Sequence, residues 1–90
     1  MSPNKKHRYT ILVADDSEMN RSILRSMLED SYDIIEAEDG VQAVTVLQQK
    51  EADIALVLLD IVMPNLDGFG VLSAMNTYNW IESIPVIMIS

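Results

Sequence analysis

The sequence predicts an α/β fold in which a parallel sheet is covered by helices on both faces. Two observations lead to this prediction. Short apolar runs typical of buried strands alternate with segments whose apolar residues recur at helical spacing. They follow the order strand, helix, strand, helix, strand, helix, strand, which favours a parallel sheet with right-handed crossovers. The 90 residues suffice for one domain.

The first half of the chain supplies two strands and the helix between them. Residues 9–14 are apolar, and an acidic pair ends them. A helix is predicted from Ser17 to about Glu29, with Asp16 or Ser17 as its N-cap. Residues 32–37 are predicted to form a second strand. The apolar positions of the helix are Met19, Ile23, Leu24, Met27 and Leu28.

The middle of the chain supplies a second helix and the most apolar strand. After a turn at residues 38–40, the helix runs to about Lys50. Residues 54–59 are predicted to form a central strand, buried on both faces. A loop is expected at residues 61–68, because Pro64 lacks a backbone donor and an Asp-Gly pair marks a turn.

A third helix and a fourth strand complete the pattern. A polar connector is expected to follow the helix at residues 76–83, with Trp80 and Ile81 as hydrophobic anchors. Pro85 then precedes the last strand, residues 86–90, and proline is tolerated at the start of a strand.

Charge is distributed unevenly along the chain. The net charge is −8, yet Lys5, Lys6 and Arg8 are three of the six basic residues. All 14 acidic residues follow Tyr9. We therefore expect residues 1–8 to be a basic, disordered leader, and we expect no direct binding of nucleic acid by the folded part.

Composition excludes several other classes. The chain has no cysteine, so it has no disulfide framework and no thiolate metal site. No apolar run approaches the roughly 20 residues needed to span a bilayer, and the start makes a poor signal peptide. We expect a cytoplasmic protein that makes no membrane contact.

Three aspartates follow two of the predicted strands. Asp15 and Asp16 come directly after the first strand, and Asp60 comes directly after the third. Ligands bind at the carboxyl ends of parallel strands, and three carboxylates there suit a hard divalent cation. Helix capping or a solvated strand end would explain a single aspartate. Two adjacent aspartates that face a third favour a functional site.

Three segments carry a family resemblance. They are residues 11–17 (Ile-Leu-Val-Ala-Asp-Asp-Ser), residues 60–68 (Asp-Ile-Val-Met-Pro-Asn-Leu-Asp-Gly) and residues 85–90 (Pro-Val-Ile-Met-Ile-Ser). In this order and spacing they resemble the receiver domain of response regulators in two-component phosphorelays. The resemblance covers nearly the whole chain from Tyr9. It implies a flavodoxin-like fold, with strand order 2-1-3-4 for the strands present.

The resemblance also implies roles for individual residues. Asp60 would accept a phosphoryl group from the phosphohistidine of a sensor histidine kinase or phosphotransfer protein. Asp16 would coordinate Mg²⁺ directly and Asp15 mainly through water, while the Val62 carbonyl would add a metal ligand. Ser90 would donate a hydrogen bond to a phosphoryl oxygen in the active state. The domain would then be no enzyme, capable at most of self-phosphorylation and autodephosphorylation.

Chemistry gives Mg²⁺ a reason to be at such a site. Phosphoryl transfer brings negative charge to a carboxylate, and two unit charges about 4 Å apart interact by roughly 4 kcal/mol at an effective dielectric near 20. Mg²⁺ offsets this repulsion and bridges acceptor and phosphoryl oxygens. Val62 would lie beside the phosphoryl group and offers no hydrogen bond to an attacking water. We therefore expect slow hydrolysis of the phosphorylated domain.

The chain departs from the family after its fourth strand. The resemblance implies a fifth strand, two further helices and a lysine that pairs with the phosphoryl group. We expect residues 9–90 to be an incomplete receiver domain that binds Mg²⁺ weakly and switches poorly. Its fourth strand would be an apolar edge, which favours self-association through residues 86–89.

Two other functions are consistent with part of this pattern. Mg²⁺-dependent phosphohydrolases with an aspartate nucleophile usually carry a second acid two residues later. Val62 occupies that position here, which counts against them. The other alternative is an interaction or dimerisation module that keeps the fold without the switch.

Overall fold

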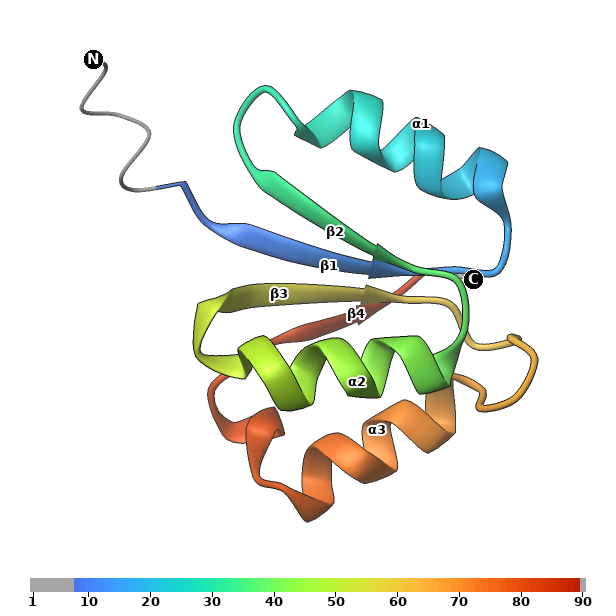
Figure 1. The fold of residues 1–90 in the computed structure, drawn as a ribbon, viewed down its shortest axis with the longest axis vertical. Helices are drawn as coiled ribbons and strands as arrows, with labels where there is room; N and C mark the ends of the chain where they lie inside the picture. Colours follow the sequence, from blue (N-terminus) through green and yellow to red (C-terminus); the bar gives the residue numbers. More distant parts are fainter. Residues whose placement is uncertain (1–7, 90) are drawn as a thin grey trace.

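The computed structural model describes residues 8–89. Its strands are β1 (Thr10–Ala14), β2 (Asp33–Ala37), β3 (Ile54–Leu59) and β4 (Val86–Met88), and its α-helices are α1 (Glu18–Leu28), α2 (Gly40–Lys50) and α3 (Gly68–Thr77). The strands form one parallel sheet in the order β2-β1-β3-β4, which confirms the predicted fold and strand order. Helix α1 lies on one face of the sheet, and α2 and α3 lie on the other (Figure 1).

The core has two layers, because successive residues of a strand point to opposite faces of the sheet. The larger layer lies between the sheet and helices α2 and α3, and it includes Leu12, Leu47, Val57, Leu59 and Met75. The smaller layer lies under α1, and it includes Ile11, Val13 and Leu58 with Leu24 and Leu28 of the helix. β1 is paired with β2 on one side and with β3 on the other, and its alternating side chains contribute to both layers.

Each α-helix begins at a polar residue that caps its N-terminus. Ser17, Asp39 and Asp67 each accept a hydrogen bond from the backbone N–H three residues further along, at 3.2, 2.8 and 2.9 Å. Such caps satisfy backbone donors that have no partner within the helix. Of the two caps predicted for the first helix, Ser17 is the cap, and Asp16 is left outside the helix.

The connector before β4 is more ordered than the sequence pattern indicated. A one-turn 3₁₀-helix spans Trp80–Glu82 and follows Asn79, whose φ of 62° is left-handed. Trp80 is buried and stacks on Tyr78 with ring centroids 4.8 Å apart. Ile81 is exposed, so its prediction as a hydrophobic anchor was wrong. A single helical turn presents only one side to the core, and Trp80 occupies that side.

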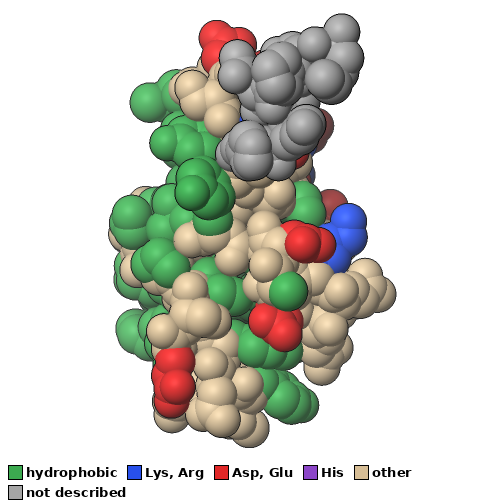
Figure 2. Space-filling view, turned by 90° about the vertical axis from the view of Figure 1, so that its left-hand side faces the viewer, with side chains coloured by type: hydrophobic (Ala, Val, Ile, Leu, Met, Phe, Trp, Pro, Cys, Tyr) green, Lys and Arg blue, Asp and Glu red, His purple; other side chains and the backbone are tan. Residues whose placement is uncertain are grey.

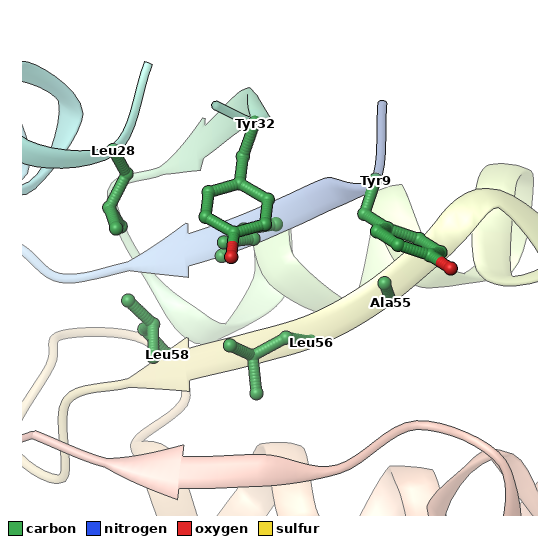
Figure 3. Close-up of a pocket in the computed structure, with 7 residues that line it drawn as sticks. Tyr9, Leu28, Tyr32, Ala55, Leu56 and Leu58 are labelled. Atoms are coloured by element: carbon green, nitrogen blue, oxygen red, sulfur yellow. The ribbon is translucent and has the colours of Figure 1, made fainter. Parts of the chain in front are cut away.

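The sheet face beside α1 is only partly covered. A hollow of about 270 Å³ lies there, lined by Tyr9, Ile11, Leu28, Tyr32, Ala55, Leu56 and Leu58 (Figure 3). Because β3 borders this hollow, Ala55 and Leu56 stay half-buried, and the prediction that this strand is buried on both faces was wrong for its first half. Figure 2 shows hydrophobic side chains gathered along one flank of the molecule.

The start of the described chain is attached to β2. The Arg8 guanidinium lies 3.1 Å from the carboxylate of Asp33 and donates a hydrogen bond to the Tyr32 carbonyl at 2.7 Å. The rest of the predicted leader, residues 1–7, lies outside the described residues. None of the helices in residues 8–89 has the length and apolar character of a membrane span.

Candidate functional site

Three carboxylates meet at the carboxyl-terminal edge of the sheet. Asp15, Asp16 and Asp60 each place one carboxylate oxygen within 4.8 Å of the others. The cause is the register of two neighbouring strands: Ala14 of β1 is paired with Leu59 of β3, and the backbone N–H of Asp60 donates to the Ala14 carbonyl at 2.8 Å. The residues that follow both strands therefore lie side by side, as the spacing of the sequence indicated.

Asp15 is held by four hydrogen bonds and is only 4% exposed. Its carboxylate accepts from the Ser17 backbone N–H at 2.9 Å and from the Asn20 side-chain amide at 3.3 Å. Its backbone N–H donates to the Ala37 carbonyl at 3.1 Å, and its own carbonyl accepts from the Arg21 guanidinium at 2.7 Å. Asp15 is thus fixed on both its main chain and its side chain.

Asp16 contrasts with its neighbour because it is exposed. Its carboxylate accepts no hydrogen bond from residues 8–89, so it can turn towards a cation without losing a partner. A second hollow, of about 240 Å³, borders the cluster, and Asp15, Asn20, Ile23, Leu24 and Ile89 line it. The cluster is therefore open to solvent on the side of α1.

Asp60 is buried, and its surroundings disfavour its charge. Burial raises the pKa of this carboxyl, and the negative charge of Asp15 raises it further. The Val62 backbone N–H donates to one Asp60 oxygen at 3.4 Å, and this contact acts in the opposite direction. A cation at this edge would relieve the repulsion that the protein itself leaves in place.

The loop after Asp60 is fastened at two points. The Gly68 backbone N–H donates to the Ile61 carbonyl at 2.8 Å, which joins the two ends of the loop. The Asn65 side chain, whose backbone is left-handed at φ 69°, donates to the Asp39 carboxylate at 2.7 Å. The Asp39 pKa is lowered by hydrogen bonds from the Gln42 backbone and from Asn65. The loop that follows Asp60 therefore rests on the start of α2.

Val62 and Ser90 are the remaining predicted site residues. Val62 follows Asp60 by two residues; its backbone N–H bonds to the Asp60 carboxylate and its side chain is exposed. Ser90 lies outside the described residues. Its neighbour Ile89 donates a backbone hydrogen bond to the Leu59 carbonyl at 2.9 Å, which extends the pairing of β4 with β3 towards the acidic edge.

The structure adds two residues to the site that the sequence did not identify as such. Asn20 and Arg21 follow the acidic pair along α1 and contact the side chain and the carbonyl of Asp15. For Asn20 the sequence signal is its spacing, since it lies one helical turn after the Ser17 cap and its side chain returns to Asp15, two residues before that cap.

Comparison with known proteins identifies the family. The family model described as response regulator receiver domain matches residues 11–90. The chain is 36% identical over 87 residues to the two-component response regulator-like PRR37 of Oryza sativa subsp. indica, covering 96% of this chain and 12% of that protein. It is 44% identical over 70 residues to the chemotaxis protein CheY of Halobacterium salinarum, covering 77% and 57%.

A solved structure agrees with these matches. The CheX-CheY-BeF₃-Mg²⁺ complex of Borrelia burgdorferi contains a chain that matches with a TM-score of 0.77 and 30% identity, covering 89% of this chain and 60% of that one. The present chain thus spans about an eighth of the rice protein and somewhat over half of each CheY. With its strand order and its three clustered aspartates, the chain belongs to the response regulator receiver domain family.

Proposed function

We propose that this domain is a signalling module that accepts a phosphoryl group on Asp60 from a histidine kinase or phosphotransfer protein. The observation that carries the proposal is the cluster of three carboxylates within 4.8 Å, with Asp60 buried at the end of β3. In the transfer, an Asp60 oxygen attacks phosphorus, the phosphorus–nitrogen bond of phosphohistidine breaks, and its electron pair returns to the imidazole.

Mg²⁺ is the cation that we propose for this cluster. The donor set consists of carboxylate oxygens, which Mg²⁺ prefers, and it typically takes one or two of them while keeping several waters. Asp16 is the proposed direct ligand because its carboxylate accepts no hydrogen bond from residues 8–89. Asp15, which is already held, would act mainly through water, and Asp60 and the Val62 carbonyl complete the set. The Borrelia burgdorferi CheY was solved with Mg²⁺, which supports this choice.

Bound Mg²⁺ would offset the charge that builds up when a phosphoryl group approaches Asp60. The protein's own contribution is to hold the acceptor in place through the fastened loop and to keep Asp15 fixed beside it. Ser90 is proposed to donate a hydrogen bond to the phosphoryl group. The phosphohydrolase alternative gains no support, since Val62 supplies no second acid.

A labelling experiment tests the proposal. The 90-residue chain would be incubated with a small phosphodonor such as phosphoramidate, with Mg²⁺ or with EDTA, and its mass measured. We expect phosphoryl labelling of the wild type only with Mg²⁺, and none of Asp60→Asn. Asp53→Asn is the matched control, because Asp53 is an exposed acid just before the opposite end of β3. Equal labelling of wild type and Asp60→Asn would refute the proposal.

We also propose two properties of the domain in its setting. It self-associates through β4, which pairs only with β3 among the described residues and carries the exposed Ile87. It works in the cytoplasm, which is typical of the family.

A further inference from the structure

The guanidinium of Arg21 joins the acidic turn to β2. Its Nη1 donates to the Asp15 carbonyl at 2.7 Å, and its Nε donates to a Glu36 oxygen at 3.0 Å. The Arg21 side chain is 11% exposed, so both contacts are largely protected from water. Asp15 is in addition bonded through its backbone N–H to β2, at Ala37. Two successive residues of β2 therefore hold the turn, one directly and one through Arg21.

Arg25 lies one turn further along α1. Like Arg21 it bonds to Glu36, but unlike Arg21 it does not bond to the Asp15 carbonyl. Its Nε donates to the other Glu36 oxygen at 2.6 Å, and a second nitrogen lies 3.4 Å from the Ile34 carbonyl. Each carboxylate oxygen of Glu36 thus accepts a hydrogen bond from a different arginine. Because Arg25 does not reach the acidic turn, it serves as an internal comparison for any effect of the ion pair on α1 alone.

The contact with the Asp15 carbonyl bears directly on Asp16. The carbonyl of Asp15 and the N–H of Asp16 belong to one planar peptide, so a bond that fixes the carbonyl also fixes how the chain enters Asp16. The Asp16 carboxylate has no partner of its own among the described residues. Its direction towards the other two carboxylates depends on its backbone.

We propose that Arg21, braced by Glu36, is a positioning residue that orients the acidic turn and thereby sets the affinity of the cluster for a divalent cation. This inference rests on the proposed function in one respect, namely that the cluster holds Mg²⁺. An arginine suits the task because its rigid, planar fork serves two acceptors at once, whereas a lysine ammonium is a point charge on a flexible stem.

Two pairs of matched variants test the proposal in the 90-residue chain. Arg21→Lys and Arg25→Lys keep the charge but lose the fork. Arg21→Met and Arg25→Met also remove a positive charge, which alone would strengthen binding of Mg²⁺. Mg²⁺ affinity would be measured by calorimetric titration, and stability by urea unfolding in EDTA, so that a loss of cation binding is separated from a loosened helix.

We expect both Arg21 variants to bind Mg²⁺ about tenfold more weakly, since groups that orient a metal's ligands are worth about 10- to 100-fold in affinity. The Arg25 variants should change the Mg²⁺ affinity less than about twofold while losing about as much stability as the Arg21 variants. Arg25 contacts Glu36, the Ile34 carbonyl and, at 4.0 Å, the Glu29 carboxylate, and none of these belongs to the acidic turn. Unchanged affinity in the Arg21 variants, or equal losses in both pairs, would overturn the inference. A wild type that binds no Mg²⁺ would instead refute the proposed function.

Discussion

Asp15 and Asp60 are the buried acidic residues of the part of the chain that the structure describes, and they end neighbouring strands of one sheet. Their carboxylates belong to a cluster whose oxygens lie within 4.8 Å of one another. Like charges in partial burial oppose folding, so this edge of the sheet is maintained against a free-energy cost.

Replacing Asp60 with asparagine should stabilise the domain in the absence of a divalent cation. The pKa of Asp60 is raised, by burial first and by Asp15 second, so its protonated form favours the fold. Its contribution to stability is fully present below the ordinary pKa of 3.8 and is lost as the pH rises through the folded value. At pH 7 in EDTA, Asp60→Asn should therefore have a higher urea midpoint than wild type. A lower midpoint would contradict the repulsion argument.

Glu36 should contribute stability with the opposite dependence on pH. Its pKa lies below the usual 4.5, chiefly because of the hydrogen bond from Arg25 and also because of Arg21. The stability that it supplies is present above pH 4.5 and is lost as the pH falls through the lowered value. Partly exposed ion pairs contribute about 0.2–1 kcal/mol each. Glu36→Gln should thus be about 1 kcal/mol less stable than wild type at pH 7. Urea titrations across pH would show the two converging in acid, and a constant difference would argue against it.

Gly68 should not tolerate a side chain. A Cβ there would lie 2.4 Å from the Asp60 carbonyl oxygen and 2.9 Å from the Ile61 Cα, and backbone atoms cannot yield cheaply. We expect Gly68→Ala to lose about 1–3 kcal/mol of unfolding free energy and to reduce labelling of Asp60.

Gly70→Ala is the control for this prediction. Its Cβ would meet the side chain of Leu66, at 2.3 Å from Cδ1, and a side chain can rotate away. Alanine also favours a helix over glycine by about 1 kcal/mol. Urea unfolding should place this variant near wild type. Equal losses for both variants would mean that the backbone contact at Asp60 is unimportant.

Val62→Asn should shorten the lifetime of the phosphorylated domain. The Val62 side chain is exposed two residues after Asp60, and it offers no hydrogen bond to an attacking water. An amide at that position can hold the water beside the phosphoryl group. The measurement is the decay of phosphorylated protein after removal of the donor, with Val41→Asn, an exposed valine of α2, as control. Indistinguishable half-lives would count against a role for this position.

Ile87→Lys should reduce self-association. Ile87 is 52% exposed on β4, and a charge on an edge strand discourages pairing with a second chain. Light scattering over a concentration series should show a mass that rises for wild type and stays monomeric for the variant. A wild type that is monomeric at every concentration would remove the basis for the proposed pairing.

The order of elements, the strand order and the meeting of the three aspartates could be predicted, because each depends on a local pattern combined with the topology of parallel sheets. The contact of Arg21 with the Asp15 carbonyl could not be, since a backbone acceptor leaves no mark in the side-chain pattern. The bond from Asn65 to Asp39 depends on how two loops approach each other, which periodicity does not encode. The prediction that Ile81 is a hydrophobic anchor failed for a related reason, because a one-turn helix has too few residues to show a periodic pattern.

The central position of β1 has a consequence for how the domain is made. Leu12 of β1 is paired with Ile35 of β2 and also with Val57 of β3, which is far along the chain. During synthesis β1 can pair early on one side only, and its other side stays unpaired until β3 has emerged. Pairings between distant segments slow folding and prolong the exposure of apolar strands. β1, the strand that leads into Asp15 and Asp16, is thus also the strand whose pairing with β3 sets when the sheet can assemble.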